Sequence, residues 1–123
     1  MSQQQYQVIR DFLCIKMPKE IDHHHAETIS RRADQFICQE KVNNIIFDFE
    51  ETDFMDSSGI GIIAGRYKKV QVFGGKIYVV NAGVQVKRIL SLSGLQQYII
   101  WMKKDRKKNA EGRSQVTWKR EEN

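Results

Sequence analysis

Phe54-Met55-Asp56-Ser57-Ser58-Gly59-Ile60-Gly61 is the stretch that decides the fold, because it joins two segments of different periodicity. The run before it, Ile45-Ile46-Phe47-Asp48-Phe49, is short and mostly apolar, which is typical of a central β-strand. The segment after it is predicted to be a helix, with Ile60, Ile63, Ala64 and Tyr67 on one apolar stripe and Arg66, Lys68 and Lys69 off it. The stretch therefore lies at the carboxyl end of a strand, where α/β sheets commonly present their functional sites.

Strands and helices alternate on both sides of this junction. Residues 7–17 are predicted to form two extended pieces with a turn near Arg10-Asp11, and Asp22 is a good N-cap for an amphipathic helix over about residues 23–40. Downstream, we expect a strand over residues 76–80, a helix from Val84 or Val86 that Gly94 closes, and a last, edge strand over residues 98–101. The order β-β-α-β-α-β-α-β predicts the α/β class, with a central mixed sheet of about five strands and three to four helices.

The net charge of +5 is unevenly distributed along the chain. Residues 1–102 contain 12 Lys/Arg and 11 Asp/Glu, whereas residues 103–123 contain 8 and 4. We therefore expect one domain over residues 1–102 and a basic C-terminal tail over residues 103–123, either disordered or partly helical. Because the basic residues belong mostly to this tail and only Trp118 interrupts them as an aromatic residue, we expect no direct contact with nucleic acid.

Other features of the sequence favour a cytoplasmic protein. The N-terminus has no basic patch followed by an apolar run, so we expect no secretory signal. A membrane helix needs about 20 apolar residues, and the apolar runs here are only a handful of residues long, so we expect no membrane segment. Cys14 and Cys38 fit neither a zinc spacing nor a CxxC redox pair, and we expect two buried free thiols, which suit a reducing compartment.

Three interpretations of Asp56-Ser57-Ser58-Gly59 remain open from the residues alone. The simplest is that Asp56, Ser57 and Ser58 only cap a helix. A nucleophilic serine is disfavoured because no Gly lies two residues before Ser57 and no His is evidently placed as its base. A phosphate-binding loop is disfavoured because the Walker A pattern is absent. The position predicts that Ser57 is exposed on a loop, beside the free N–H groups and the positive dipole end of a helix.

Three groups of residues carry a resemblance to a known family. They are Glu20-Ile21-Asp22-His23-His24 with Ala26-Glu27-Thr28, the 54–61 stretch leading into Gly65-Arg66-Tyr67-Lys68, and Val86-Lys87-Arg88 with Leu92-Ser93-Gly94-Leu95. In this order, from about Val8 to Trp101, they resemble the STAS domain, and specifically the anti-sigma factor antagonists of spore-forming bacteria.

The resemblance implies a STAS fold and a protein-binding switch, not an enzyme, with no cofactor. In such antagonists the unphosphorylated form binds a serine-kinase anti-sigma factor and frees the sigma factor. The kinase then phosphorylates the serine after the Asp, here Ser57, which switches binding off, and a PP2C-type phosphatase reverses the step. The resemblance assigns the partner-binding surface to Asp22, Asp56, Ser57, Ser58 and Gly59, and it implies a monomer.

The chain departs from the family pattern near the first of these groups. Lys19 stands where many relatives have Gly, and His25 replaces a residue that is often Thr. The run His23-His24-His25 does not favour a metal site, because consecutive side chains on a helix point about 100° apart. Two alternatives stay open: a STAS scaffold or regulatory module in another signalling assembly, and a small enzyme or nucleotide-binding domain, for which the sequence offers no base, metal cluster or phosphate loop.

Overall fold

The computed structural model describes residues 5–121, apart from the side chains of residues 106, 107 and 116. Its central element is a six-stranded sheet in the order β1-β2-β4-β6-β7-β8. The inner pairs β2–β4, β4–β6 and β6–β7 are parallel, and the outer pairs β1–β2 and β7–β8 are antiparallel. The strands are β1 (Tyr6–Ile9), β2 (Phe12–Lys16), β4 (Asn44–Asp48), β6 (Ile77–Val80), β7 (Ile99–Lys108) and β8 (Ser114–Arg120). The predicted α/β class with a mixed central sheet is confirmed, with six strands in place of about five.

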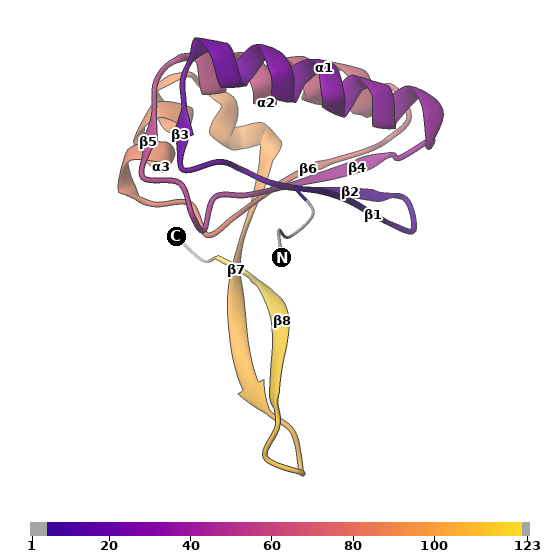
Figure 1. The fold of residues 1–123 in the computed structure, drawn as a ribbon, viewed down its shortest axis with the longest axis vertical. Helices are drawn as coiled ribbons and strands as arrows, with labels where there is room; N and C mark the ends of the chain where they lie inside the picture. Colours follow the sequence, from indigo (N-terminus) through magenta and orange to yellow (C-terminus); the bar gives the residue numbers. More distant parts are fainter. Residues whose placement is uncertain (1–4, 122–123) are drawn as a thin grey trace.

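Three α-helices accompany the sheet. They are α1 (His23–Gln39), α2 (Ser58–Gln71) and α3 (Val84–Leu92), and a short 3₁₀ helix, η1 (Leu95–Tyr98), follows α3. Helices α1 and α2 lie side by side over one face of the sheet (Figure 1). Two further strands, β3 (Glu20–Ile21) and β5 (Phe54–Met55), form a small parallel sheet of their own just before α1 and α2.

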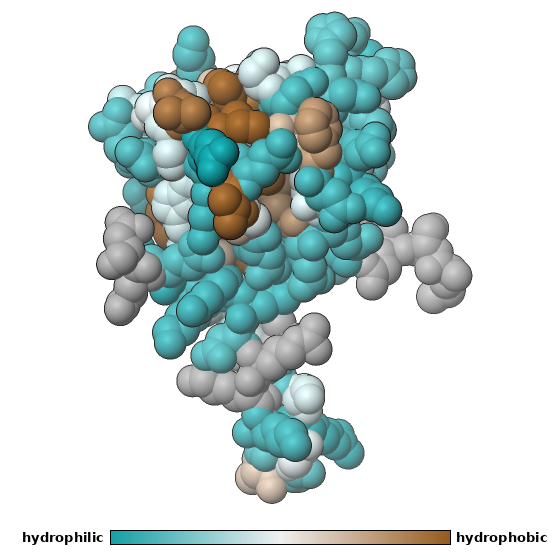
Figure 2. Space-filling view, turned by 90° about the vertical axis from the view of Figure 1, so that its left-hand side faces the viewer, coloured by the Kyte–Doolittle hydropathy of each residue, from teal (hydrophilic) through white to brown (hydrophobic). Residues whose placement is uncertain are grey.

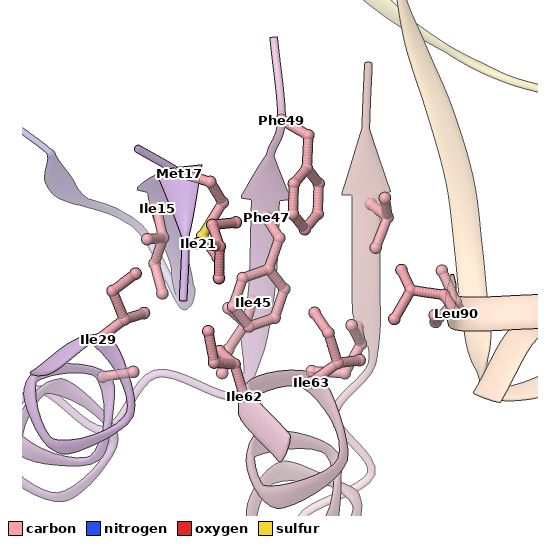
Figure 3. Close-up of a cluster of buried hydrophobic side chains, with 14 of the residues drawn as sticks. Ile15, Met17, Ile21, Ile29, Ile45, Phe47, Phe49, Ile62, Ile63 and Leu90 are labelled. Atoms are coloured by element: carbon pink, nitrogen blue, oxygen red, sulfur yellow. The ribbon is translucent and has the colours of Figure 1, made fainter. Parts of the chain in front are cut away.

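The core lies between the sheet and its helices. Every second side chain of β2 and β4 is buried, as expected for strands that have one face against helices. Figure 3 shows Ile15, Ile45 and Phe47 from these strands facing the helical residues Ile29, Ile62 and Ile63. On the alternate positions the side chains are only half-buried, including Cys14, and Cys38 is exposed on α1. The expectation of two buried thiols is therefore wrong.

The buried stripe of α2 differs from the predicted one. Ile62, Ile63 and Val70 are buried together with Arg66, which is only 7% exposed, while Ile60 and Tyr67 are half-buried. Arg66 is buried because α1 packs on α2 and places Asp34 beside it, with 3.0 Å between Arg66 Nε and Asp34 Oδ1. Burial lowers the pKa of the Arg66 guanidinium, and the charge of Asp34 opposes this effect.

The C-terminal segment also differs from its prediction. Strand β7 is not an edge strand, because β6 and β8 flank it. Residues 103–120, which were expected to belong to a disordered or partly helical tail, form a hairpin: residues 103–108 continue β7, and β8 pairs with β7 from Met102↔Arg120 to Lys108↔Ser114. The turn is closed by Asn109, whose Oδ1 accepts hydrogen bonds from the amides of Glu111 and Arg113, and Gly112 adopts the φ of +77° that the turn needs. Backbone pairing and this turn specify the hairpin without the apolar alternation on which the sequence-based prediction depended.

We expect Asp34→Ala to lower the free energy of unfolding by about 2 kcal/mol, because it leaves the buried Arg66 guanidinium without its charged partner. The loss is smaller than for a fully buried pair because the Asp34 side chain is 35% exposed. Urea unfolding measures the change. The matched control is Lys69→Ala, which removes a half-exposed ammonium group 3.9 Å from the other Asp34 oxygen and should cost about 0.5 kcal/mol or less. Equal losses in the two variants would contradict the assignment.

Candidate functional site

The small sheet β3–β5 brings two distant parts of the chain together. Its register pairs Glu20 with Phe54 and Ile21 with Met55, so the next residues along each strand, Asp22 and Asp56, are neighbours. The Asp56 amide donates a hydrogen bond to the Ile21 carbonyl at 3.0 Å. This pairing places the start of α1 beside the start of α2, at the end of the molecule where β3, β5 and α3 are labelled (Figure 1).

Lys19 takes part in the same pairing. Its carbonyl accepts hydrogen bonds from the amides of Asp53 and Phe54, and its ammonium group lies 3.6 Å from the Asp53 carboxylate. Just before it, the Pro18 carbonyl accepts a hydrogen bond from the Thr52 hydroxyl. The turn ahead of Asp22 is therefore tied to the β5 segment by backbone and side-chain contacts.

Asp22 is the N-cap of α1, as predicted. Its Oδ1 accepts a hydrogen bond from the His25 amide at 2.9 Å and lies 2.8 Å from His25 Nδ1. The backbone hydrogen bond from His25 is the main cause that lowers the pKa of the Asp22 carboxyl. Both side chains are about half exposed, so the cap is also part of the accessible surface of the site.

Ser57 is exposed at the N-cap position of α2, and its side chain makes no capping hydrogen bond. The cap is made by Asp56, whose Oδ1 accepts a hydrogen bond from the Ser58 amide at 2.8 Å. Of the three residues expected as alternative caps, only Asp56 therefore serves the first turn with its side chain. The Ser57 hydroxyl is accessible and is not needed to hold the helix.

Gly59 lies on the inner side of the same turn, which packs against the protein core. It is buried, and a Cβ at this position would overlap the sulfur of Met55 and lie 2.7 Å from its Cγ. Met55 is 1% exposed, and its amide donates a hydrogen bond to the Gln85 side chain at the start of α3. Gly59 thus lets α2 start against β5, while Gln85 ties β5 to α3.

Apolar side chains are exposed around the site. The end of the molecule that carries β3, β5 and α3 in Figure 1 faces the viewer in Figure 2, where apolar residues gather among polar ones. The large exposed apolar residues on these elements are Phe54 (44%), Val84 (76%) and Leu92 (82%). Sequence reasoning missed Val84 as a surface residue, because one apolar residue at a helix start fits a core position equally well. An exposed apolar surface around polar loop residues is typical of a protein-docking site.

The structure holds no sign of a metal centre at this site. Within residues 5–121, no three His, Cys, Asp or Glu side chains gather so that they could hold a metal ion, and the exposed His23, His24 and His25 are no exception. None of the described helices has the length and apolar character to cross a membrane.

The family is shown by comparison with known proteins. A family model described as the STAS domain matches residues 3–109. The chain therefore belongs to the STAS-domain family, and the match extends beyond the domain boundary expected at residue 102.

Relatives within this family are anti-sigma factor antagonists. The anti-sigma F factor antagonist of Paenibacillus polymyxa is 35% identical over 86 residues, which are 70% of this chain and 74% of that protein. The structure of the anti-sigma factor antagonist SpoIIAA in its unphosphorylated form is similar with a TM-score of 0.71 and 32% identity, covering 78% of this chain and 86% of that chain. The Bacillus cell fate determinant SpoIIAA in its phosphorylated form is similar with a TM-score of 0.65 and 31% identity, covering 78% and 89%. The predicted STAS fold is confirmed.

We expect Gly59→Ala to destabilise the protein by about 1 to 2 kcal/mol, because the added methyl group overlaps buried Met55 and this overpacking outweighs the gain in helix propensity. The matched control is Gly61→Ala in the same turn, where a Cβ meets nothing within 4 Å. This control should stabilise the protein by about 0.5 to 1 kcal/mol. Urea unfolding distinguishes the two, and stabilisation by both substitutions would contradict the close packing at Gly59.

We expect the contribution of Asp22 to stability to depend on pH. Its folded-state pKa is lowered below the ordinary value of 3.8, so the cap stabilises the fold above that pH and is lost as the pH falls through the folded-state pKa. Asp22→Ala should therefore be less stable than the unchanged protein at about pH 5, and the difference should shrink toward about pH 3. Urea unfolding at matched pH values measures it.

The control for this prediction is Asp22→Asn, which keeps an acceptor for the His25 amide but has no ionisable group at the position. Its stability relative to Asp22→Ala should stay constant over the same pH range. A constant difference between the unchanged protein and Asp22→Ala would mean that the charge of Asp22 does not contribute to the cap.

Proposed function

We propose that this protein is an anti-sigma factor antagonist that is switched by phosphorylation. Its unphosphorylated form binds a serine-kinase anti-sigma factor and frees the sigma factor. The kinase transfers phosphate from ATP to Ser57, which ends binding, and a PP2C-type phosphatase restores the active form. Asp22, Asp56 and Ser58 form the partner-binding surface with Ser57, whereas Gly59, which was expected on this surface, is buried beneath it against Met55.

The observation that carries this proposal is the state of the Ser57 side chain. It is exposed at the start of α2, and Asp56 provides the cap in its place. A kinase can therefore reach the hydroxyl without opening the fold, and phosphorylation removes no capping hydrogen bond. The similarity to SpoIIAA, whose structure is known in unphosphorylated and phosphorylated forms, supports the same conclusion.

Electrostatics explains how one phosphate stops binding and leaves the fold intact. Phosphorylation adds about −1.5 to −2 charge and three acceptor oxygens. At the start of α2 the helix dipole favours negative charge, which stabilises the phosphorylated fold. The carboxylates of Asp22 and Asp56 already lie near this position, so the phosphate adds to negative charge that the surface carries.

The apolar residues around Ser57 make the surface sensitive to this charge. A partner that packs on the exposed Phe54, three residues before Ser57, excludes water from this loop and so desolvates Ser57 as well. The desolvation free energy of a neutral hydroxyl is small when the hydroxyl finds a hydrogen bond. The desolvation free energy of a doubly charged phosphate next to two carboxylates is much larger. Such a difference is enough to weaken docking by about a hundredfold or more.

The same proposal implies the setting of the protein. It acts as a monomer in the cytoplasm, needs no cofactor and performs no catalysis itself, because ATP and the transfer chemistry belong to the kinase. Regulation then depends on the competing rates of the kinase and the phosphatase at a single side chain.

We expect the purified chain, incubated with ATP and a serine-kinase anti-sigma factor from the same organism, to acquire one phosphate on Ser57. Mass spectrometry of peptides locates the group. Ser57→Ala should bind the kinase and remain unmodified, and Ser57→Asp should bind about a hundredfold more weakly, because it places a fixed charge on the docking surface. Titration calorimetry measures both affinities.

The control for this experiment is Ser58→Ala. Ser58 is the adjacent, half-buried hydroxyl on the same turn, and its amide keeps the bond to Asp56 after the substitution. This variant should be phosphorylated at Ser57, and because it adds no charge, its binding should weaken far less than the hundredfold loss expected for Ser57→Asp. Phosphate on Ser58, or undiminished binding by Ser57→Asp, would refute the assignment of the switch.

A further inference from the structure

The hairpin β7–β8 extends well beyond the body of the protein (Figure 1). The pairing of β7 with β6 ends at Val80↔Met102, and only β8 accompanies β7 from there to Lys108. Six residues at about 3.4 Å each give a two-stranded ribbon that projects about 20 Å. The STAS match ends at residue 109, so it includes the β7 strand of the ribbon, whereas β8 lies outside the matched region.

The base of the ribbon is held firmly to the body. Lys104 Nζ lies 3.0 Å from Glu50 Oε1 and 3.8 Å from Asp48 Oδ2, and it sits 5.7 Å from the centre of the Trp118 ring. Its amide donates a hydrogen bond to the Asn81 side chain, which follows β6. Glu121, just after β8, pairs with Lys87 of α3 at 3.0 Å. The ribbon therefore has a defined direction relative to the sheet.

Basic side chains occupy both faces of this ribbon. Residues 103–120 contain eight Lys/Arg and two Asp/Glu. Because side chains alternate along each strand, Lys103 and Lys119 lie on one face, and Lys108 and Arg120 lie on the other. These four side chains are exposed, as is Arg113 in the turn.

One pair of charges stands out by its position. Lys103 and Lys119 are directly opposite each other in the register, and like charges at such positions destabilise a strand pair. Within the part of the chain that the structure describes, neither ammonium group forms an ion pair. The carboxylate of Asp105 lies on the same face, two residues from Lys103, and an anionic partner against this face would relieve the repulsion that remains.

We propose that the β7–β8 ribbon binds the phosphate backbone of a nucleic-acid duplex, without regard to base sequence, by lying in its major groove. The major groove of B-form DNA is about 12 Å wide and admits a two-stranded ribbon. Phosphates then flank the ribbon on both sides, which matches basic residues on both faces and in the turn. This proposal reverses the expectation of no nucleic-acid contact, which rested on a basic tail over residues 103–123, disordered or partly helical, with only Trp118 as an aromatic residue.

The distribution of charge favours this partner over three others. An acidic protein surface and an anionic membrane each contact one face of a ribbon and leave the charges of the other face unpaired. A second copy of the chain, pairing along the exposed edge of β8, would pair backbone groups and leave the basic side chains on both faces without an anion. Only a groove lined by phosphates complements both faces at once.

The test is fluorescence anisotropy of a labelled random-sequence DNA duplex with the full chain. We expect a dissociation constant of about 1 to 100 µM near physiological salt. The logarithm of the binding constant should fall against the logarithm of the salt concentration with a slope of about −3 to −4. Lys103→Glu combined with Lys119→Glu should weaken binding by about tenfold or more and reduce the magnitude of that slope by about 2.

The matched control is Arg31→Glu combined with Lys76→Glu, which makes the same change in net charge at exposed positions of the body. This control should bind nearly as well as the unchanged chain, and circular dichroism verifies that each variant is folded. Equal losses in both double variants would overturn the proposal in favour of diffuse attraction. So would absence of duplex binding at low salt, equal binding of a single-stranded oligonucleotide, or binding only to vesicles of phosphatidylcholine and phosphatidylserine.

Discussion

The pairing of β3 with β5 is the constraint on which the functional end of this protein depends. Two residues in each strand and one hydrogen bond from the Asp56 amide to the Ile21 carbonyl hold the starts of α1 and α2 together. Neither loop has this geometry by itself, because each is only a short connection between a strand and a helix. The contact of Gln85 with the Met55 amide adds the start of α3. Three helices therefore begin at one surface, and their N-terminal dipoles all contribute positive potential there.

In this arrangement, the residues that stabilise the helix starts are different from the residue that is free for modification on the surface. The side chains of Asp22 and Asp56 cap helices, since each accepts a hydrogen bond from an amide in the first turn of its helix. Ser57 is left over, exposed between them with no structural task. A change of charge at that side chain alters the potential of the surface far more than it alters the stability of α2. A residue that is dispensable for folding and central to the surface is the kind of position at which a covalent switch works well.

The sequence predicts the strand-to-helix junction, the cap at Asp22 and the exposure of Ser57, because these follow from local periodicity and from residue types that favour helix starts. It does not predict the features that depend on distant contacts. Arg66 was placed on the polar side of α2, yet α1 brings Asp34 beside it and buries it. Strands as short as β3 and β5 have no periodicity to detect. Residues 103–120 lack apolar alternation because both faces of a projecting ribbon meet water. A prediction of strands that relies on buried apolar positions therefore misses them. The turn residues Asn109 and Gly112 before Ser114 were the available signal for a hairpin.

The charges of the ribbon and the charges of the Ser57 surface are electrostatically independent of each other. The body is nearly neutral, with 12 basic and 11 acidic residues over residues 1–102, so it carries no long-range field that would draw either partner to the other's site. The turn of the ribbon lies about 20 Å beyond the sheet, on the side away from α1 and α2. That length is more than twice the Debye length of about 8 Å at physiological salt. A phosphate on Ser57 is therefore screened from Arg113 and Lys108, and the two surfaces can engage their partners independently. Two contacts link the ribbon to the part of the chain that carries Ser57: Lys104 pairs with Asp48 and Glu50 at the end of β4, the strand that leads into the Ser57 loop, and Glu121 pairs with Lys87 of α3.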